Sequence, residues 1–182
     1  DTARVAKWGV KIDAKGTTFA KEYKTDTENV VGTIANSVVS KNEVVAPGTK
    51  GEMAKIAITG TPEVAVQVGN KADFEVKGWT VDNGSFYCPL QITVSGANGK
   101  ITIDGATFED ETKFENEVKA AISTYSKNYA AGTDLSTASV TTPSVSWAWP
   151  LCVDDVKDTK LGNLETAPTV SLTVTTTVTQ ID

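Results

Sequence analysis

The chain has 182 residues, 40% of them hydrophobic, and its 23 acidic residues exceed its 17 basic residues to give a net charge of -6. The basic residues are scattered and include a single arginine, Arg4, which argues against nucleic-acid binding, and no run approaches the roughly 18 apolar residues of a membrane span. Histidine is absent, which removes Ser-His-Asp relays, Cys-His pairs and paired-His zinc sites, so we expect no enzymatic activity, no cofactor and no metal.

The opening run, residues 1–12, alternates apolar and polar residues (DTARVAKWGVKI) and predicts a strand with one apolar face. It does not start with methionine, which favours a processed N-terminus. A free-ended apolar strand needs a sheet to join, either in its own molecule or in a neighbour. The residues that would anchor such a strand are Val5, Ala6, Trp8, Val10 and Ile12.

Short β-type runs separated by turn residues continue along the chain. A turn over 13–16 leads to a predicted strand over 17–23, and further strands are expected over 53–58 and 61–68. Two Asn-Gly pairs, Asn83-Gly84 and Asn98-Gly99, favour type I′ turns. They would join strands over 74–81, 86–94 and 100–103 into an antiparallel meander.

One segment has helical periodicity instead. Between residues 110 and 128 the apolar positions recur as on one face of an amphipathic helix, with Asp110 as the expected N-cap. We interpret this helix as packing on the sheet. Its apolar face would consist of Phe114, Val118, Ala121, Ile122 and Tyr125.

After the helix, a loop-like stretch leads to a strand with Trp147 and Trp149 on one side, and then to a polar connection. The last strand, 169–180, alternates Val or Leu with Thr. Such a one-sided strand is typical of a sandwich, with its Thr face toward solvent or a packed neighbour.

Two groups of residues have alternative interpretations. Trp147 and Trp149, together with Trp79, Phe86 and Tyr87, would either stack on sugar rings or fill the space between two sheets, and we favour the core.

The acidic group Asp154, Asp155 and Asp158, with Asn163, has the oxygen ligands that calcium prefers but not EF-hand spacing, so a solvated acidic loop is favoured. The carboxylates around the predicted helix are interpreted as its N-terminal charge and polar face rather than as a catalytic pair. They are Glu109, Asp110, Glu111, Glu115 and Glu117.

The two cysteines, Cys88 and Cys152, have neither a Cys-x-x-Cys spacing nor histidine partners, which argues against a metal site. In an exported protein they would form one disulfide, which stabilises by roughly 4 kcal/mol in the chain-entropy model. Two buried free thiols are an equal alternative.

Several short motifs resemble the TasA/camelysin-type exported proteins of Gram-positive bacteria, and more closely their clostridial relatives. The resemblance runs over nearly the whole length. The motifs are ARVAKWGV (3–10), VAPGT (45–49), FYCPL (86–90), SWAWP (146–150), DTKLG (158–162) and the terminal Val-Thr strand.

The resemblance implies a jelly-roll-like domain that is secreted and forms extracellular fibres of the biofilm matrix by donor-strand complementation between identical subunits. Some members are labelled metallopeptidases, but without histidine that label does not transfer. Either residues 1–12 are the donor strand or they form the first strand of their own jelly roll.

We therefore expect a mainly β, jelly-roll-like antiparallel sandwich over 1–182, with one amphipathic helix. The expected function is that of a structural fibre subunit at the cell surface or in the matrix, in contact with identical subunits and with glycan or other matrix components. A monomeric, glycan-binding surface module is the alternative.

Overall fold

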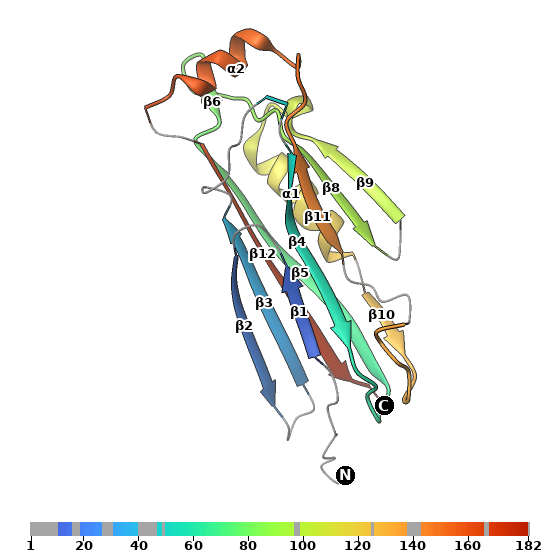
Figure 1. Ribbon diagram of the computed structural model, residues 1–182. Helices are drawn as coiled ribbons and strands as arrows, with labels where there is room; N and C mark the ends of the chain where they lie inside the picture. The colour runs from blue at the N-terminus through green and yellow to red at the C-terminus, as the bar shows by residue number, and fades with distance from the viewer. Residues whose placement is uncertain are drawn as a thin grey trace.

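The computed structural model describes residues 11–15, 19–26, 31–39, 47–48, 50–96, 99–124, 126–137, 143–165 and 168–181. Two five-stranded antiparallel sheets pack face to face, and helix α1 (Glu111–Ser123) lies along one side of them (Figure 1). The prediction of a mainly β antiparallel fold with an amphipathic helix is confirmed. No helix in the described part of the chain is long and apolar enough to cross a membrane.

Consecutive strands repeatedly change sheets, as in a jelly roll. The first sheet has the order β1-β4-β11-β8-β9. Its strands are β1 (Lys11–Lys15), β4 (Lys50–Thr59), β8 (Gln91–Gly96), β9 (Gly99–Asp104) and β11 (Ser144–Ala148). The second sheet has the order β10-β5-β12-β3-β2. Its strands are β2 (Phe19–Asp26), β3 (Val31–Val39), β5 (Val66–Lys77), β10 (Ser126–Tyr129) and β12 (Thr169–Gln180).

The hydrophobic core lies between the sheets because their strands alternate buried and exposed residues. In β5 and β12, which pair along their whole lengths, every second residue is buried. One polar pair sits in this core, where Thr176 donates its hydroxyl hydrogen to Asn70 Oδ1 at 2.8 Å. The remaining Thr residues of β12 face outward, as the sequence predicted.

Helix α1 begins where the sequence predicted and ends earlier. The Asp110 side chain accepts hydrogen bonds from the backbone N–H groups of Thr112 and Lys113, which confirms the N-cap. The helix ends at Ser123 rather than near residue 128, because Ser126–Tyr129 forms β10 and pairs with β5. The backbone hydrogen bonds of this ladder outweigh the helical pattern.

The two Asn-Gly turns have different outcomes. β8 and β9 form the predicted antiparallel pair, but Gly99 pairs with Gly96 and belongs to β9 rather than to the centre of the turn; Asn98 lies outside the described residues. At Asn83-Gly84 the turn has three residues, all with positive φ, between β6 (Thr80–Val81) and β7 (Ser85–Phe86). The long strands predicted on either side of it are interrupted at 78–79 and 87–90.

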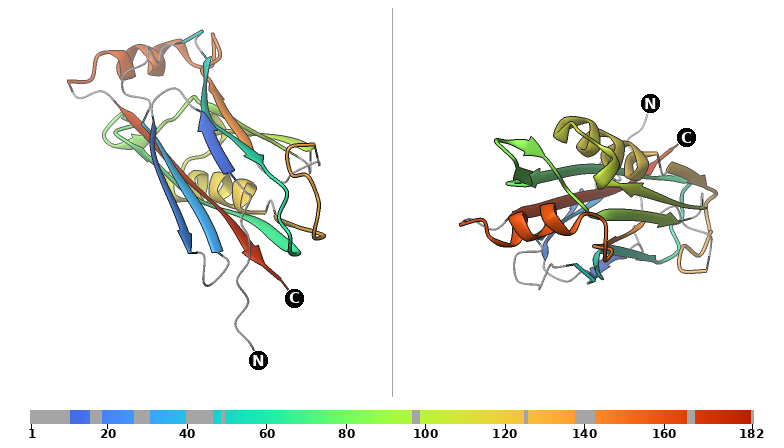
Figure 2. Two further views of the ribbon diagram at one scale, coloured as in Figure 1. Left: turned by 60° about the horizontal axis from the view of Figure 1, so that its bottom comes forward. Right: turned by 90° about the horizontal axis from the view of Figure 1, so that it is seen from above.

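Two further expectations are corrected. The predicted turn over 13–16 is strand up to Lys15, because β1 pairs with β4 through that residue. The predicted polar connection after β11 contains a second helix, α2 (Asp155–Gly162). Asp154 caps α2 by accepting a hydrogen bond from Lys157 N at 3.0 Å, and a buried Leu161 anchors it. The two views of Figure 2 show α2 across one end of the sandwich, beyond the strands.

Candidate functional site

The aromatic residues belong to the core, as we favoured, and do not form a platform for sugars. Trp79, Trp147, Trp149 and Tyr87 are all buried, and Phe86 is half-buried against the core. Trp79 packs edge-on against Trp149, with ring centroids 5.8 Å apart. An exposed glycan platform therefore has no support among these side chains.

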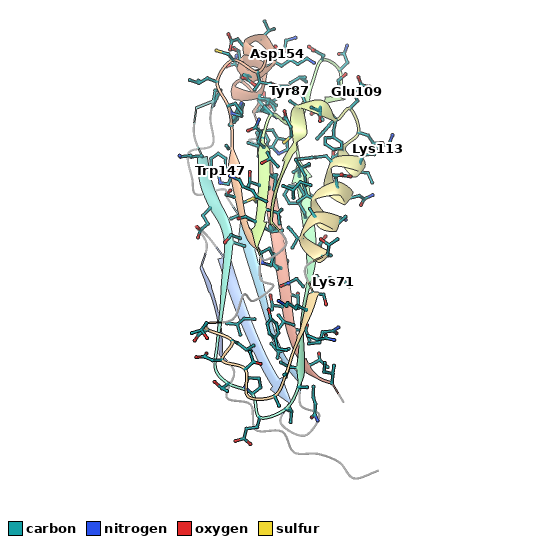
Figure 3. The ribbon with its side chains drawn as sticks, turned by 90° about the vertical axis from the view of Figure 1, so that its right-hand side faces the viewer. Lys71, Tyr87, Glu109, Lys113, Trp147 and Asp154 are labelled. Carbon is teal, nitrogen blue, oxygen red and sulfur yellow. The ribbon has the colours of Figure 1, made fainter. Side chains whose placement is uncertain are left out.

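The buried indoles differ in their hydrogen bonding. Trp79 Nε1 donates to Thr169 O at 2.9 Å. The Nε1 atoms of Trp147 and Trp149 have no acceptor in the described part of the chain. Trp147 lies in the last part of β11 and Trp149 directly follows the strand; Figure 3 shows Trp147 in the half of the molecule that carries α2.

The acidic segment after β11 has a structural role. Tyr87 donates its hydroxyl hydrogen to Asp158 Oδ1 at 2.6 Å, and both side chains are buried. Burial raises the pKa of Tyr87 well above its usual range, and the hydrogen bond to Asp158 raises it further. The ammonium group of Lys157 lies 5.4 Å from the centroid of the Tyr87 ring, a cation–π geometry. Together these contacts hold α2 against the end of the sandwich.

A calcium site is not supported at this segment. Asp154 caps the helix and Asp158 binds Tyr87. Among the described residues, no group of three or more His, Cys, Asp or Glu side chains is arranged to hold a metal ion.

The carboxylates of α1 also act structurally. Glu115 Oε2 accepts a hydrogen bond from Val76 N at 3.0 Å, and Ser123 Oγ accepts one from Ala72 N at 3.2 Å. Strand β10 pairs only with residues 66–69 of β5. Both N–H groups belong to the later part of β5, which β10 does not reach. The helix therefore covers an exposed sheet edge, one of the ways in which proteins prevent unwanted strand pairing. Burial, followed by repulsion from Glu115, raises the pKa of Glu111.

The two cysteines are not joined in the structure. Both are free, Cys88 fully buried and Cys152 exposed. Burial raises the pKa of the Cys88 thiol well above its usual range, so this thiol is a poor nucleophile. Of the two alternatives, the free thiols are the state present, although only one of them is buried.

Among the described strands, β1 covers only half of β4 on one side. On one side of β4, β1 pairs with Lys55–Thr59; on the other side, β11 pairs with residues 50–55. No described strand lies beside residues 50–54 on the β1 side. This half of β4 lies at its start, near the end of the molecule that carries α2 (Figure 1). We call residues 50–54 of β4 the open half-edge, meaning only that β1 and the other described strands do not pair with them on this side.

Of the anchor residues predicted for the donor strand, only Ile12 lies among the described residues. Val5, Ala6, Trp8 and Val10 lie outside the described residues. Ile12 belongs to β1 and pairs with Ile58 of its own chain. For residues 11 and 12, therefore, the sheet that they join is that of their own molecule.

Two shallow hollows lie on the surface of the described part of the chain. One, of about 340 Å³, lies between β9 and α1 and includes Ile101 and Ala121. The other, of about 360 Å³, lies over β4, β8 and β11 beside the open half-edge and includes Glu52 and Ser146. Neither combines groups that form a catalytic arrangement among the described residues.

The comparisons with known proteins return no family model, no curated protein and no solved structure that matches this chain.

Proposed function

We propose that the chain is a structural, non-enzymatic subunit of an extracellular protein fibre of the biofilm matrix. Identical subunits assemble head-to-tail, with the N-terminal segment of one copy adding as a strand to the sheet of the next. The observation that supports this proposal best is the open half-edge of β4. On the side of β4 where β1 pairs with Lys55–Thr59, no described strand lies beside residues 50–54, and addition of a strand at a sheet edge is a recurrent mode of association.

The direction of the chain fits this contact. β1 is antiparallel to β4, so a strand added beside residues 50–54 in line with β1 would be antiparallel too. Figure 1 shows β1 starting at the end of the molecule away from α2, whereas β4 starts near α2. If a second copy is stacked on the α2 end, the β1 strand of that copy therefore begins above the open half-edge of the first copy.

The length of the segment also fits. At about 3.3 Å per residue, ten residues span about 33 Å and the five-residue open half-edge about 17 Å. Residues 1–10 can therefore fill the half-edge and leave about five residues to cross between subunits. Because Lys11–Lys15 already pairs within its own chain, the proposed donor is residues 1–10.

The experiment compares the full chain with a variant that lacks residues 1–10, using sedimentation and light scattering. We expect the full chain to form pelletable assemblies and the shortened chain to remain monomeric and folded, because β1 is retained. A synthetic peptide of residues 1–10 should slow growth by filling open half-edges, and a peptide of the same composition in scrambled order is the control. Equal assembly of the two chains would contradict the proposal.

A further inference from the structure

Strand β9 is the outer strand of the first sheet, and no described strand lies on its far side (Figure 1). β8 pairs with it along its whole length, on one side only. The side chains of Lys100, Ile101 and Thr102 are all exposed, that of Ile101 by 47%. An outer strand of this kind is where a strand from another molecule can add to a sheet.

The register of β8 and β9 decides which backbone groups point to the outer side. Gly105 N donates to Leu90 O at 2.8 Å, in continuation of the pairing between the two strands. Hydrogen bonds of this kind occur at every second residue of an antiparallel strand, so the odd-numbered residues of β9 bond to β8. The even-numbered residues, Lys100, Thr102 and Asp104, therefore direct their N–H and C=O groups away from β8.

Residues 100–104 have the sequence KITID, which complements itself in an antiparallel pair. When two copies meet with Thr102 opposite Thr102, each Lys100 lies opposite an Asp104 and each Ile101 opposite an Ile103. The residues whose backbone groups point outward then lie opposite one another, as hydrogen bonding between the strands requires. Opposite charges, Thr pairs and well-packed apolar pairs all stabilise an antiparallel sheet.

The charges select this register over its neighbours. A lysine on an edge strand usually discourages pairing, but here it has a partner of opposite charge. A shift of two residues sets Lys100 opposite Thr102 in one direction and beyond the end of β9 in the other. A shift of one residue sets outward-pointing backbone groups opposite inward-pointing ones and removes the hydrogen bonds.

Asp104 keeps its local contacts in such a pair. Its Oδ1 accepts a hydrogen bond from Ala106 N at 3.1 Å, and its carbonyl oxygen accepts one from Thr107 Oγ1 at 2.7 Å. A carboxylate has a second oxygen and a carbonyl oxygen a second lone pair. Asp104 can therefore bind the lysine and the backbone of another strand without giving up either contact.

We propose that the outer edge of β9 pairs with the same edge of a second copy of this chain, about a two-fold axis at Thr102. The contact is isologous and uses neither residues 1–10 nor β4, so it is independent of the proposed head-to-tail contact. Five residues on each side are far fewer than the roughly 20–30 of a standard interface, so the pair is transient between single copies. Where many copies are aligned in a fibre, repeated pairs join two filaments side by side.

Disulfide trapping tests the register, because a residue on a two-fold axis lies opposite its own copy. Directly opposite residues of an antiparallel pair have Cα atoms about 5.5 Å apart, which a disulfide can span. The background is Cys152→Ala, which removes the exposed natural thiol. In this background, Thr102→Cys treated with oxidised glutathione should give a dimer, and no higher species, on a non-reducing gel.

Lys100→Cys in the same background is the matched control, because residue 100 is also exposed. In the proposed pair it lies four residues along the strand from its own copy, about 13 Å at about 3.3 Å per residue. We therefore expect Thr102→Cys to form the dimer roughly tenfold faster or more, since only its thiols are within reach of each other. Equal rates in the two variants would show random collision and would overturn the inference.

Lys100→Glu, added to the Thr102→Cys variant, tests the charge pairing. It replaces two attractions with two repulsions, so the dimer should form about fivefold more slowly at low salt. Lys71→Glu is the control: it makes the same change of charge at an exposed residue of β5 in the second sheet and should leave the rate unchanged. Equal slowing by both substitutions would contradict the proposed register.

The outcomes separate this contact from the proposed fibre function. Filaments that form while Thr102→Cys links no faster than Lys100→Cys would overturn the β9 contact and leave the fibre function standing. Faster linking through Thr102→Cys in a chain that forms no filaments would support the β9 contact and count against the fibre.

Discussion

The Tyr87 hydroxyl lies 2.6 Å from Asp158 Oδ1, although the two residues are 71 positions apart in the sequence, and both side chains are buried. This contact joins the loop after β7 to α2. The second carboxylate oxygen, Oδ2, is buried without a hydrogen-bond partner in the described part of the chain. The Tyr87 hydroxyl is therefore the one hydrogen-bond donor to this carboxylate in the described part of the chain.

Tyr87→Phe should lower the free energy of unfolding by about 2–3 kcal/mol, because it leaves a buried carboxylate without its donor. At this chain length the thermal midpoint should fall by about 5–10 °C. Differential scanning calorimetry measures the change. Asp158→Asn is the control: it keeps an acceptor for Tyr87 and removes the charge, so its effect should be smaller. Equal losses in the two variants would show that the charge, and not the donor, dominates.

Alkaline pH should destabilise the fold. The folded state raises the pKa of Tyr87 above its ordinary 10.0 and that of Cys88 above its ordinary 9.0, in both cases mainly by burial. Below pH 9 both groups are protonated in the folded and unfolded states, so they add no pH dependence. Above it the unfolded chain releases protons that the folded chain retains, so stability falls as pH rises.

The thermal midpoint measured from pH 8 to pH 11 tests this dependence. We expect a flat region to about pH 9 and a decline beyond it. Cys88→Ala should remove the part of the decline that begins near pH 9, and Tyr87→Phe the part that begins near pH 10. A decline of the same slope in the double variant would assign it to other groups.

Gly105 cannot accept a side chain. A Cβ atom at this position would lie 2.4 Å from Cys88 O and 2.9 Å from Leu90 O, and both are backbone atoms. Gly105→Ala should therefore cost about 1–3 kcal/mol of stability through overpacking, measured by urea unfolding. Gly162→Ala is the control, because no atom lies within 4 Å of its added Cβ; a similar loss in both variants would contradict the clash.

The two thiols should react at very different rates. Cys152 is exposed, whereas Cys88 is fully buried and its pKa is raised. A chromogenic disulfide reagent should therefore label one thiol per chain in the native protein and two in denaturant. Labelling of neither thiol without reductant, followed by both after reduction, would show that a disulfide forms despite their separation in the structure.

The parts of the fold that local sequence patterns determine were predictable. The alternation in β12, the Asp110 N-cap and the core position of Trp147 and Trp149 all depend on neighbouring residues, and the structure confirms them. These signals act over a few residues and do not depend on which elements meet.

The parts that depend on distant contacts were not predictable. β10 replaces the end of the expected helix because it pairs with β5, more than 50 residues earlier. α2 is short and is held by Tyr87 from another part of the chain, so its polar sequence gave no helical stripe. Its N-cap, Asp154, was the one local signal that could have indicated it. The open half-edge of β4 arises from the offset between β1 and β11, which no local pattern encodes.

Negative-stain electron microscopy of the purified chain, beside the variant that lacks residues 1–10, tests the central claim most directly. If the chain is a fibre subunit that assembles by strand addition, the full chain should form long, unbranched filaments of uniform width, and the shortened variant should appear only as single particles. Monomeric particles for both chains, or identical filaments for both, would contradict the claim.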